Sequence, residues 1–124
     1  MVRTFLLSGL ILGMLGVMIG AFGAHGIKPH VSDNMYANDQ TGVQYHFYHA
    51  IALILLGLFM KVFGAYELTI WTGIFFLGGI VVFSGSLYLM ALTDLRWLGA
   101  ITPIGGTAFI IGWLLWIIKV WKAL

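Results

Sequence analysis

Cysteine is absent from the 124 residues, and charged side chains are few. The absence of cysteine excludes disulfides, thiolate metal sites and a cysteine nucleophile. Charged residues make up 8% of the chain, whereas a soluble domain carries about 25%. A chain that is 61% hydrophobic with so few charges cannot cover its own surface in water, so the composition predicts an integral membrane protein. The six basic and four acidic residues lie between hydrophobic runs and form no patch, and we therefore predict no nucleic-acid partner.

Ionisable residues are also missing from inside the hydrophobic runs, apart from two histidines near the start of the second run. Intramembrane charges are typical of proton- and ion-coupled carriers, so their absence argues against that class. A serine hydrolase is disfavoured as well, because Ser84 and Ser86 would need a nearby base and His49 is the only candidate. We therefore predict that the protein is not an enzyme.

The hydrophobic runs number four, and each is close to or longer than the ~20 residues that a bilayer requires. They cover residues 4–24, 41–63, 68–92 and 98–121. The links between the last three runs are short, so neighbouring runs should be antiparallel. A polar outer loop at 25–40 joins the first two runs, and Thr41 with Gln44 has the form of a capping box that would begin the second helix. The expected fold is a single all-α domain, an antiparallel bundle of four transmembrane helices.

Glycines recur at helical spacing along these runs. Those of the first run advance by three and four residues and stay within one stripe of a helix, and the later runs carry pairs seven apart. Small residues let helix backbones approach closely, which drives packing in lipid. A stripe that lines a substrate path is the alternative. The predicted packing glycines are Gly9, Gly13, Gly16, Gly20, Gly78, Gly85, Gly99 and Gly106.

Pro103 and the pair Gly105-Gly106 interrupt the fourth run near its beginning. An unwound turn there could point free N–H groups at an anion, as in transporter sites. Threonine followed by proline is also ordinary at the start of a helix. We favour the helix start, with a kink or a short unwound turn at this position.

Basic residues are distributed unequally between the two ends of the predicted bundle. Four runs place both termini on one side. That side has four basic residues, Arg3, Lys61, Lys119 and Lys122, and the other side has two, Lys28 and Arg96. By the positive-inside rule, this predicts a multi-pass protein of the cell membrane with cytoplasmic N and C termini.

Imidazole, phenol and amide side chains gather where the second run begins. Candidate ligand-binding residues at this outer face are His25, Gln44, Tyr45, His46, Tyr48 and His49, and four more lie in the later runs, Ser84, Ser86, Tyr88 and Thr102. Imidazoles at one membrane face could bind a transition metal or haem, and with the tyrosines they could hold a quinone or a lipid head group. The alternative is a set of interfacial side chains bonded to the backbone or to lipid. No carboxylate lies in the histidine motif to orient a ring, so we predict no metal and no cofactor.

His49 is expected about two turns inside its helix, too deep to be fully hydrated. A buried imidazole needs a hydrogen-bond partner. We therefore predict that His49 points into the bundle and bonds a hydroxyl or carbonyl of another helix, with a structural role. His46 and His25 are expected nearer the head groups and more tolerant of substitution.

Four blocks of sequence carry a resemblance to a known family. They read GAFGAHG (Gly20–Gly26), TGVQYHFYHAIALILL (Thr41–Leu56), FSGSLYLMALT (Phe83–Thr93) and LGAITPIGG (Leu98–Gly106). The chain resembles, over nearly its whole length, the bacterial membrane proteins of the domain of unknown function 423 family, and it is similar to the eukaryotic transmembrane protein 256 group. It departs from them mainly at Lys28 to Asp39, where family members have a better amphipathic helix. The resemblance implies a small four-helix membrane protein and supplies no established reaction, substrate or catalytic residue.

The favoured function is that of a small non-enzymatic accessory or membrane-organising protein that acts through helix–helix contacts. Its expected partners are the lipid bilayer and further copies of itself or other membrane proteins. The alternative is a small binding or transport protein for a lipid, a quinone, a metal or haem at the His-rich outer face.

Overall fold

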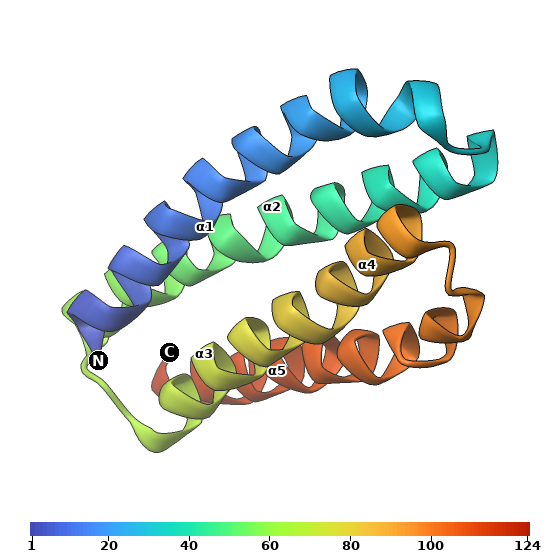
Figure 1. Cartoon of the computed structure of the whole chain (residues 1–124). Helices are drawn as coiled ribbons and strands as arrows, with labels where there is room; N and C mark the ends of the chain where they lie inside the picture. The colour runs from blue at the N-terminus through green and yellow to red at the C-terminus, as the bar shows by residue number, and fades with distance from the viewer.

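A computed structural model describes all 124 residues, and it is helical throughout. Four helical segments are long and apolar enough to cross a membrane: Val2–His30, Asp33–Phe63, Glu67–Thr93 and Arg96–Ala123. They run antiparallel in two pairs, with the first segment along the second and the fourth along the third (Figure 1). The predicted all-α bundle of four transmembrane helices is confirmed.

The first segment packs mainly on one neighbour, α2. It consists of α1 (Val2–Phe22), a π-helical turn η1 (Gly23–Ile27) and a 3-10 turn η2 (Lys28–His30). Only three residues of α1 are buried, Phe5, Gly9 and Gly16, because α1 packs mainly on α2 and leaves its other side to lipid.

The second segment, α2 (Asp33–Phe63), begins eight residues before Thr41. The predicted start at Thr41 and the predicted polar loop at 25–40 are therefore wrong. Ser32 caps α2 by accepting a hydrogen bond from the Met35 N–H at 3.2 Å. Thr41 lies inside the helix and donates to the Ala37 carbonyl. The polar composition of residues 33–40 concealed the helix, because these residues show no clear apolar period. The extra turns place the histidines of α2 near the middle of a helix about 46 Å long.

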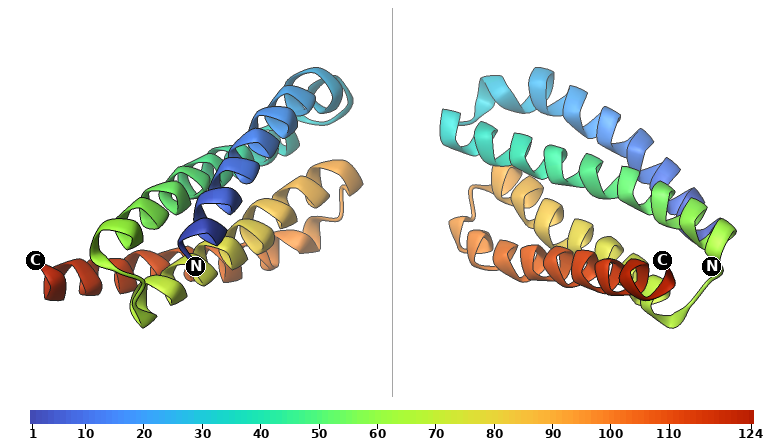
Figure 2. Two further views of the ribbon diagram at one scale, coloured as in Figure 1. Left: turned by 90° about the vertical axis from the view of Figure 1, so that its left-hand side faces the viewer. Right: turned by 180° about the vertical axis from the view of Figure 1, so that it is seen from behind.

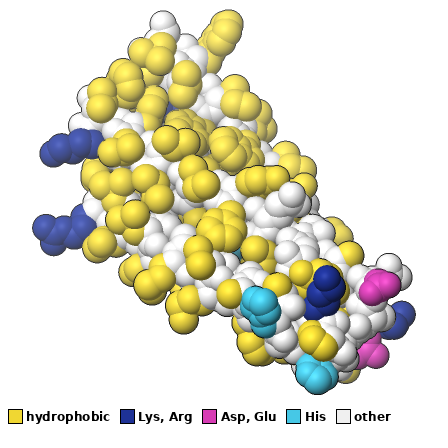
Figure 3. Space-filling model, turned by 90° about the horizontal axis from the view of Figure 1, so that it is seen from above, with side chains coloured by type: hydrophobic (Ala, Val, Ile, Leu, Met, Phe, Trp, Pro, Cys, Tyr) yellow, Lys and Arg dark blue, Asp and Glu magenta, His cyan; other side chains and the backbone are white.

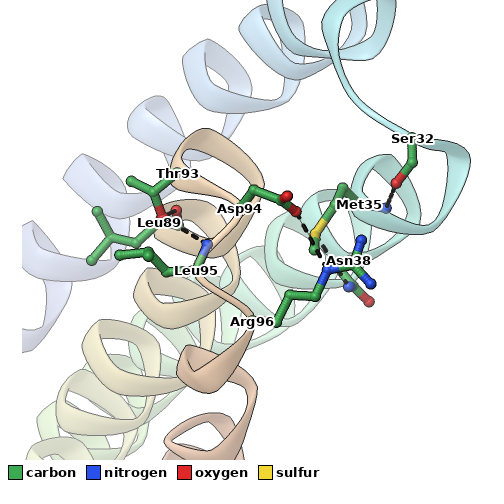
Figure 4. A network of polar contacts seen from close by, with 8 residues as sticks. All are labelled: Ser32, Met35, Asn38, Leu89, Thr93, Asp94, Leu95 and Arg96. Carbon is green, nitrogen blue, oxygen red and sulfur yellow. Dashed lines mark hydrogen bonds and ion pairs between the residues drawn. The ribbon is translucent and has the colours of Figure 1, made fainter.

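The third segment is one helical rod with an irregular middle. It comprises α3 (Glu67–Gly79), a π-helical turn η3 (Ile80–Ser84) and α4 (Gly85–Thr93). Asp94 ends the rod in the left-handed conformation with φ 57°. The short link that follows is held by an ion pair between Asp94 and Arg96 at 3.5 Å, and by the Thr93 hydroxyl, as Figure 4 shows.

The fourth segment starts with a 3-10 turn, η4 (Arg96–Ala100), and continues as α5 (Thr102–Ala123). The span therefore begins near Leu98, as expected, but the α-helix itself starts at Thr102 with Pro103 in its first turn. This confirms the helix-start interpretation, since proline lacks the N–H that the first turn leaves unpaired.

Two hydrophobic clusters fill the interior. The larger contains Phe5, Ala52, Leu53, Leu56, Met60, Phe76, Ile80 and Phe109. The smaller contains Met35, Leu87, Met90 and Leu98, at the other end of α2. Both chain termini and the α2–α3 link lie at one end of the molecule, as the views in Figures 1 and 2 agree. We call the half near the termini the proximal half and the other the distal half.

Glycines bring the helices together at several crossings. A Cβ atom on Gly9 would lie 2.7 Å from the Ala50 carbonyl oxygen, and one on Gly16 would lie 3.0 Å from the Phe47 ring. Gly20 makes only an ordinary contact with α2, and Gly99 and Gly106 have no close neighbour. Gly13, Gly78 and Gly85 face open space, so the structure does not bring these predicted packing residues into contact within one chain. Tight crossings occur at Gly79, Gly105 and Gly112, which belong to the seven-spaced small residues of the later runs, and at Gly42, Gly57 and Gly73, which the prediction omitted.

Candidate functional site

Polar side chains are buried mainly in the distal half and the middle of the bundle. They are Asp39, His46, His49, Ser84 and Ser86, and two threonines of α3, Thr69 and Thr72, are buried as well. Three of the seven come from α2 and four from the third segment, and the two threonines donate to the nearby carbonyls of Tyr66 and Leu68. The early start of α2 is what carries its polar residues inside the protein.

His46 links three helices. Its Nε2 atom lies 2.7 Å from the Leu12 carbonyl oxygen of α1, and its Nδ1 atom lies 2.9 Å from the Tyr88 hydroxyl of α4. A carbonyl can only accept, so Nε2 donates, and the neutral ring then accepts from Tyr88 at Nδ1. Gly42 makes this possible, since a Cβ there would lie 2.9 Å from the Tyr88 ring. His46 lies near the middle of α2 and not at the mouth of a helix that starts at Thr41, and these contacts bury its side chain, which is only 3% exposed.

His49 points toward α5. Its Nδ1 donates to the Tyr45 carbonyl at 2.7 Å, and its Nε2 accepts from the Trp113 indole N–H at 3.0 Å. The imidazole stacks on Phe109, with ring centres 3.5 Å apart. His49 therefore points into the bundle as predicted, but its partner on another helix is an indole and not a hydroxyl or carbonyl.

The serine hydroxyls serve helix contacts. Ser84 donates to the Gly42 carbonyl of α2 at 2.7 Å in a fully buried position. Ser86 bonds the Phe83 carbonyl and lies 2.6 Å from the Thr102 hydroxyl of α5. Hydroxyls bonded across helices are typical of membrane bundles. Neither serine is paired with a base, as a nucleophile would be.

Asp39 differs from these buried histidines and serines because its polar atoms have no hydrogen-bond partner. Its side chain is 0% exposed, and neither carboxylate oxygen has a hydrogen-bond partner. It packs against the π-helical turn, where a Cβ on Gly23 would collide with Oδ2. The neighbouring Gln40 Nε2 is also buried and unpaired. A buried polar group without a partner is rare in folded proteins and calls for an explanation.

The structure separates the residues that were expected to form one outer entrance. His25 and Gln44 are exposed, Tyr48 is 52% exposed and Tyr45 is 38% exposed. His46 bonds toward α1 and α4, whereas His49 bonds toward α5. Consecutive residues of a helix are rotated by about 100°, so the α2 residues of the predicted entrance point to different faces, although Tyr45 and His49 remain stacked with ring centres 6.3 Å apart. Asp39 and Trp113 were missed. Ser32-Asp33 was the available sign that residue 39 lies in a helix, and nothing in the sequence singled out Trp113.

The arrangement offers little to a metal ion. Both ring nitrogens of His46 and of His49 are bonded within the protein. No three His, Cys, Asp or Glu side chains come together in a group that could hold a metal. The bonded rings of His46 and His49 are therefore not free to take the two axial positions of a haem.

Comparison with known proteins bears directly on this site. The family described as "Protein of unknown function (DUF423)" matches residues 19–106. The chain belongs to this family. The matched DUF423 region includes every buried polar residue described above, from Asp39 to Ser86. Trp113, the partner of His49, lies beyond it.

Relatives of this DUF423 member match over almost their full length. The chain is 43% identical to a UPF0382 membrane protein of Staphylococcus haemolyticus over 121 residues, which cover 97% of each chain. It is 40% identical to the UPF0382 membrane protein YwdK of Bacillus subtilis over 122 residues, which cover 98% of this chain and 99% of the relative. No solved structure matches the chain. The protein is thus a membrane protein of a family whose activity is not characterised.

A lateral groove lies beside His49, between α2, the third segment and α5. It has a volume of about 430 Å³. Its lining is mostly aromatic and aliphatic, with Tyr45, His49 and Thr107 among the few polar side chains. Small-molecule sites typically have such a volume and such a lining.

Proposed function

We propose that this DUF423 protein is a non-enzymatic protein of the cytoplasmic membrane that organises other transmembrane helices by packing against them, and first of all those of a second copy. The observation that carries the proposal is the outer face of the third segment, where Gly78 and Gly85 meet no atom of their own chain. Large residues flank these glycines and are strongly exposed, with Val81 at 71% and Leu89 at 52%.

The shape of this face supports the proposal. A hollow of about 490 Å³ extends from Gly85 between the third segment and the start of the fourth, before α5 begins, and it is lined by Val81, Leu89, Leu98 and Ile101 among others. A small residue between large ones lets the backbone of a second helix approach, and such contacts drive association in lipid. The tightly packed glycines inside the bundle allow close approach of a neighbouring helix in the same way. We therefore expect Gly78 and Gly85 to contact a helix that belongs to another chain.

The polar interior supports a non-enzymatic role. The hydroxyls of Ser84 and Ser86 are bonded to backbone carbonyls, and both nitrogens of His49 are bonded as well. Nucleophilic catalysis requires a nucleophile within hydrogen-bond reach of a base, and these groups do not form such a pair.

The test is association in vesicles, measured by crosslinking of single-cysteine proteins, which the cysteine-free chain makes straightforward. Gly85→Leu should abolish crosslinks across the outer face of the third segment. Gly13→Leu is the matched control, because Gly13 also meets no atom within 4 Å but lies on α1. Equal crosslinking in the wild type and Gly85→Leu, or equal loss in both variants, would overturn the proposal.

A second candidate function is the binding of an apolar ligand such as a quinone or a lipid tail, and the groove beside His49 favours it. Gly106→Leu would fill this groove without a backbone collision, since the nearest atom to a Cβ there is 3.7 Å away. If the groove binds a ligand, lipid-soluble molecules that copurify with the wild type should be lost from this variant. Identical extracts from both proteins would exclude the groove as a binding site.

The proposed orientation places both termini in the cytoplasm. Four basic residues and one acidic residue lie in the proximal half or beside it, and the distal half has two basic and three acidic residues. This asymmetry favours a cytoplasmic proximal end. A membrane-impermeant thiol reagent added outside cells should label Ser32→Cys and leave Ala65→Cys unmodified, and the reverse pattern would contradict the orientation.

A further inference from the structure

A groove at the proximal end of the α1–α2 pair has two basic residues beside an apolar channel. Its volume is about 590 Å³, and its lining is Val2, Arg3, Leu6, Leu7, Leu10 and Lys61. No acidic residue belongs to the lining. The groove combines a surface for a hydrocarbon chain with two positive charges.

The helix crossing fixes both charges at this groove. α1 meets α2 where Leu6 faces Gly57, and a Cβ on Gly57 would lie 2.7 Å from the Leu6 side chain. Lys61 follows Gly57 by one helical turn, and Arg3 precedes Leu6 by almost one turn. The close approach at Gly57 therefore places one cation from each helix beside the same channel.

Neither charge is neutralised by the protein. The one ion pair of the structure joins Asp94 and Arg96 at the distal end. Lys119, another proximal cation, lies over the Tyr66 ring at 3.4 Å. Figure 3 shows, on a largely hydrophobic surface, Lys and Arg side chains at one end without acidic neighbours, whereas at the opposite end the Lys and Arg side chains lie among the histidine and acidic ones.

We propose that this groove binds an anionic phospholipid, with the phosphate between Arg3 and Lys61 and an acyl chain along Leu6, Leu7 and Leu10. Each element of the lipid has a counterpart. The two unpaired cations match the negative head group, and basic pockets between transmembrane helices on the cytoplasmic side are known to hold anionic head groups. The long apolar channel matches the chain, which free phosphate does not possess. This site lies at the opposite end of the bundle from His25 and His30; it rests on the proposed orientation but not on the proposed association of helices.

Native mass spectrometry of the purified full chain, titrated with phosphatidylglycerol and with phosphatidylcholine, tests the proposal. Phosphatidylglycerol should bind more tightly. Arg3→Gln and Lys61→Gln should each weaken it about fivefold and the double variant about 25-fold, from the contribution of one basic residue near an anionic lipid. Lys122→Gln is the matched control, because it removes one charge from the same end but not from the groove, and it should leave the affinity unchanged. Helical content and the thermal midpoint of each variant establish that it is folded.

Two further measurements distinguish a lipid from its phosphate. Leu10→Trp fills the apolar channel, keeps both charges, and should also lose affinity for phosphatidylglycerol. Inorganic phosphate at the same concentration should not displace the lipid. Equal binding of both phospholipids, equal loss in Lys122→Gln and Lys61→Gln, or full binding by Leu10→Trp would each overturn the proposal, and displacement by inorganic phosphate would assign the site to a free anion instead.

Discussion

The two halves of the bundle are held together by different interactions. In the proximal half, Phe5, Leu56 and Phe76 pack into an apolar core in which rings fit against glycines of the facing helix. In the distal half, His46 and Ser84 tie helices together with hydrogen bonds, and Asp39 is buried among them without a partner. Lipid tails are as apolar as leucine, so burial of apolar side chains does not by itself drive helices together in a membrane. Close packing therefore stabilises the proximal half, and hydrogen bonds between helices stabilise the distal half. The polar half also contains a residue, the buried and unpaired Asp39, that lowers the stability of the fold, and such residues are typical of functional regions.

The largest expected effect is in the apolar half. Phe76 is 0% exposed and fits against Gly112 of α5. Phe76→Ala should lower the free energy of unfolding by about 3–5 kcal/mol, because it removes a buried ring and leaves a cavity. Thermal unfolding in detergent measures this. Ile74→Ala on the exposed side of α3 is the control and should change stability by less than about 0.5 kcal/mol. Similar losses in both variants would mean that the proximal core is not the main source of stability.

The next effect is in the polar half. His46→Leu leaves the Tyr88 hydroxyl without its partner and should destabilise the bundle by about 1–3 kcal/mol. His49→Leu should cost less in lost hydrogen bonding, because His49 makes one bond to another helix, and such bonds average about 0.6 kcal/mol in a membrane protein. Gln44→Leu, on the exposed side of α2, is the control. If His49→Leu is the more damaging of the two histidine variants in the same unfolding assay, the bridge from α1 to α4 is not the main polar link.

The smallest effect has the opposite sign. Asp39→Leu removes a buried group that has no partner and should raise stability by about 1 kcal/mol. Asp33→Leu is the matched control, because Asp33 is exposed in the first turn of α2, where its charge favours the helix. The control should lower stability by about 0.3–1 kcal/mol. Thermal midpoints in detergent separate the two signs. A loss of stability in Asp39→Leu would show that the carboxyl has a partner that the isolated chain does not provide.

The architecture could be predicted because hydrophobic length and short links determine it. Four apolar runs of bilayer length leave few arrangements, and Pro103 marked the start of α5 correctly. The start of α2 was missed because Thr41 and Gln44 have the form of a capping box, whereas Thr41 lies inside the helix and donates to the Ala37 carbonyl. Residues 33–40 are polar, yet the Ser32 cap and the neighbouring helices stabilise them as helix. Helix formation here follows from tertiary contacts, which a local pattern does not contain.

The site was less predictable than the fold, since it depends on which way each side chain points. His46 and His49 are three residues apart on one helix, but they face different partners because α2 has neighbours on several sides. The residue types suggested that the two imidazoles share one site, but the packing of the helices gives each imidazole its own partners. Tyr88 and Ser84 were recognised as polar residues of an apolar span, but their partners lie more than forty positions away along the chain.

The π-helical turn η3 has a consequence for how the length of this protein can change in evolution. A π-helical turn accommodates one residue more than the α-helical turn it interrupts. Deletion of Val81, which is 71% exposed to lipid, would let residues 80–84 close into an ordinary α-helix and leave the helix faces on both sides aligned as before. The same deletion in the middle of α5 would rotate one half of that helix by about 100° against the other. The third span can therefore lose one residue at this turn while its neighbours keep their contacts.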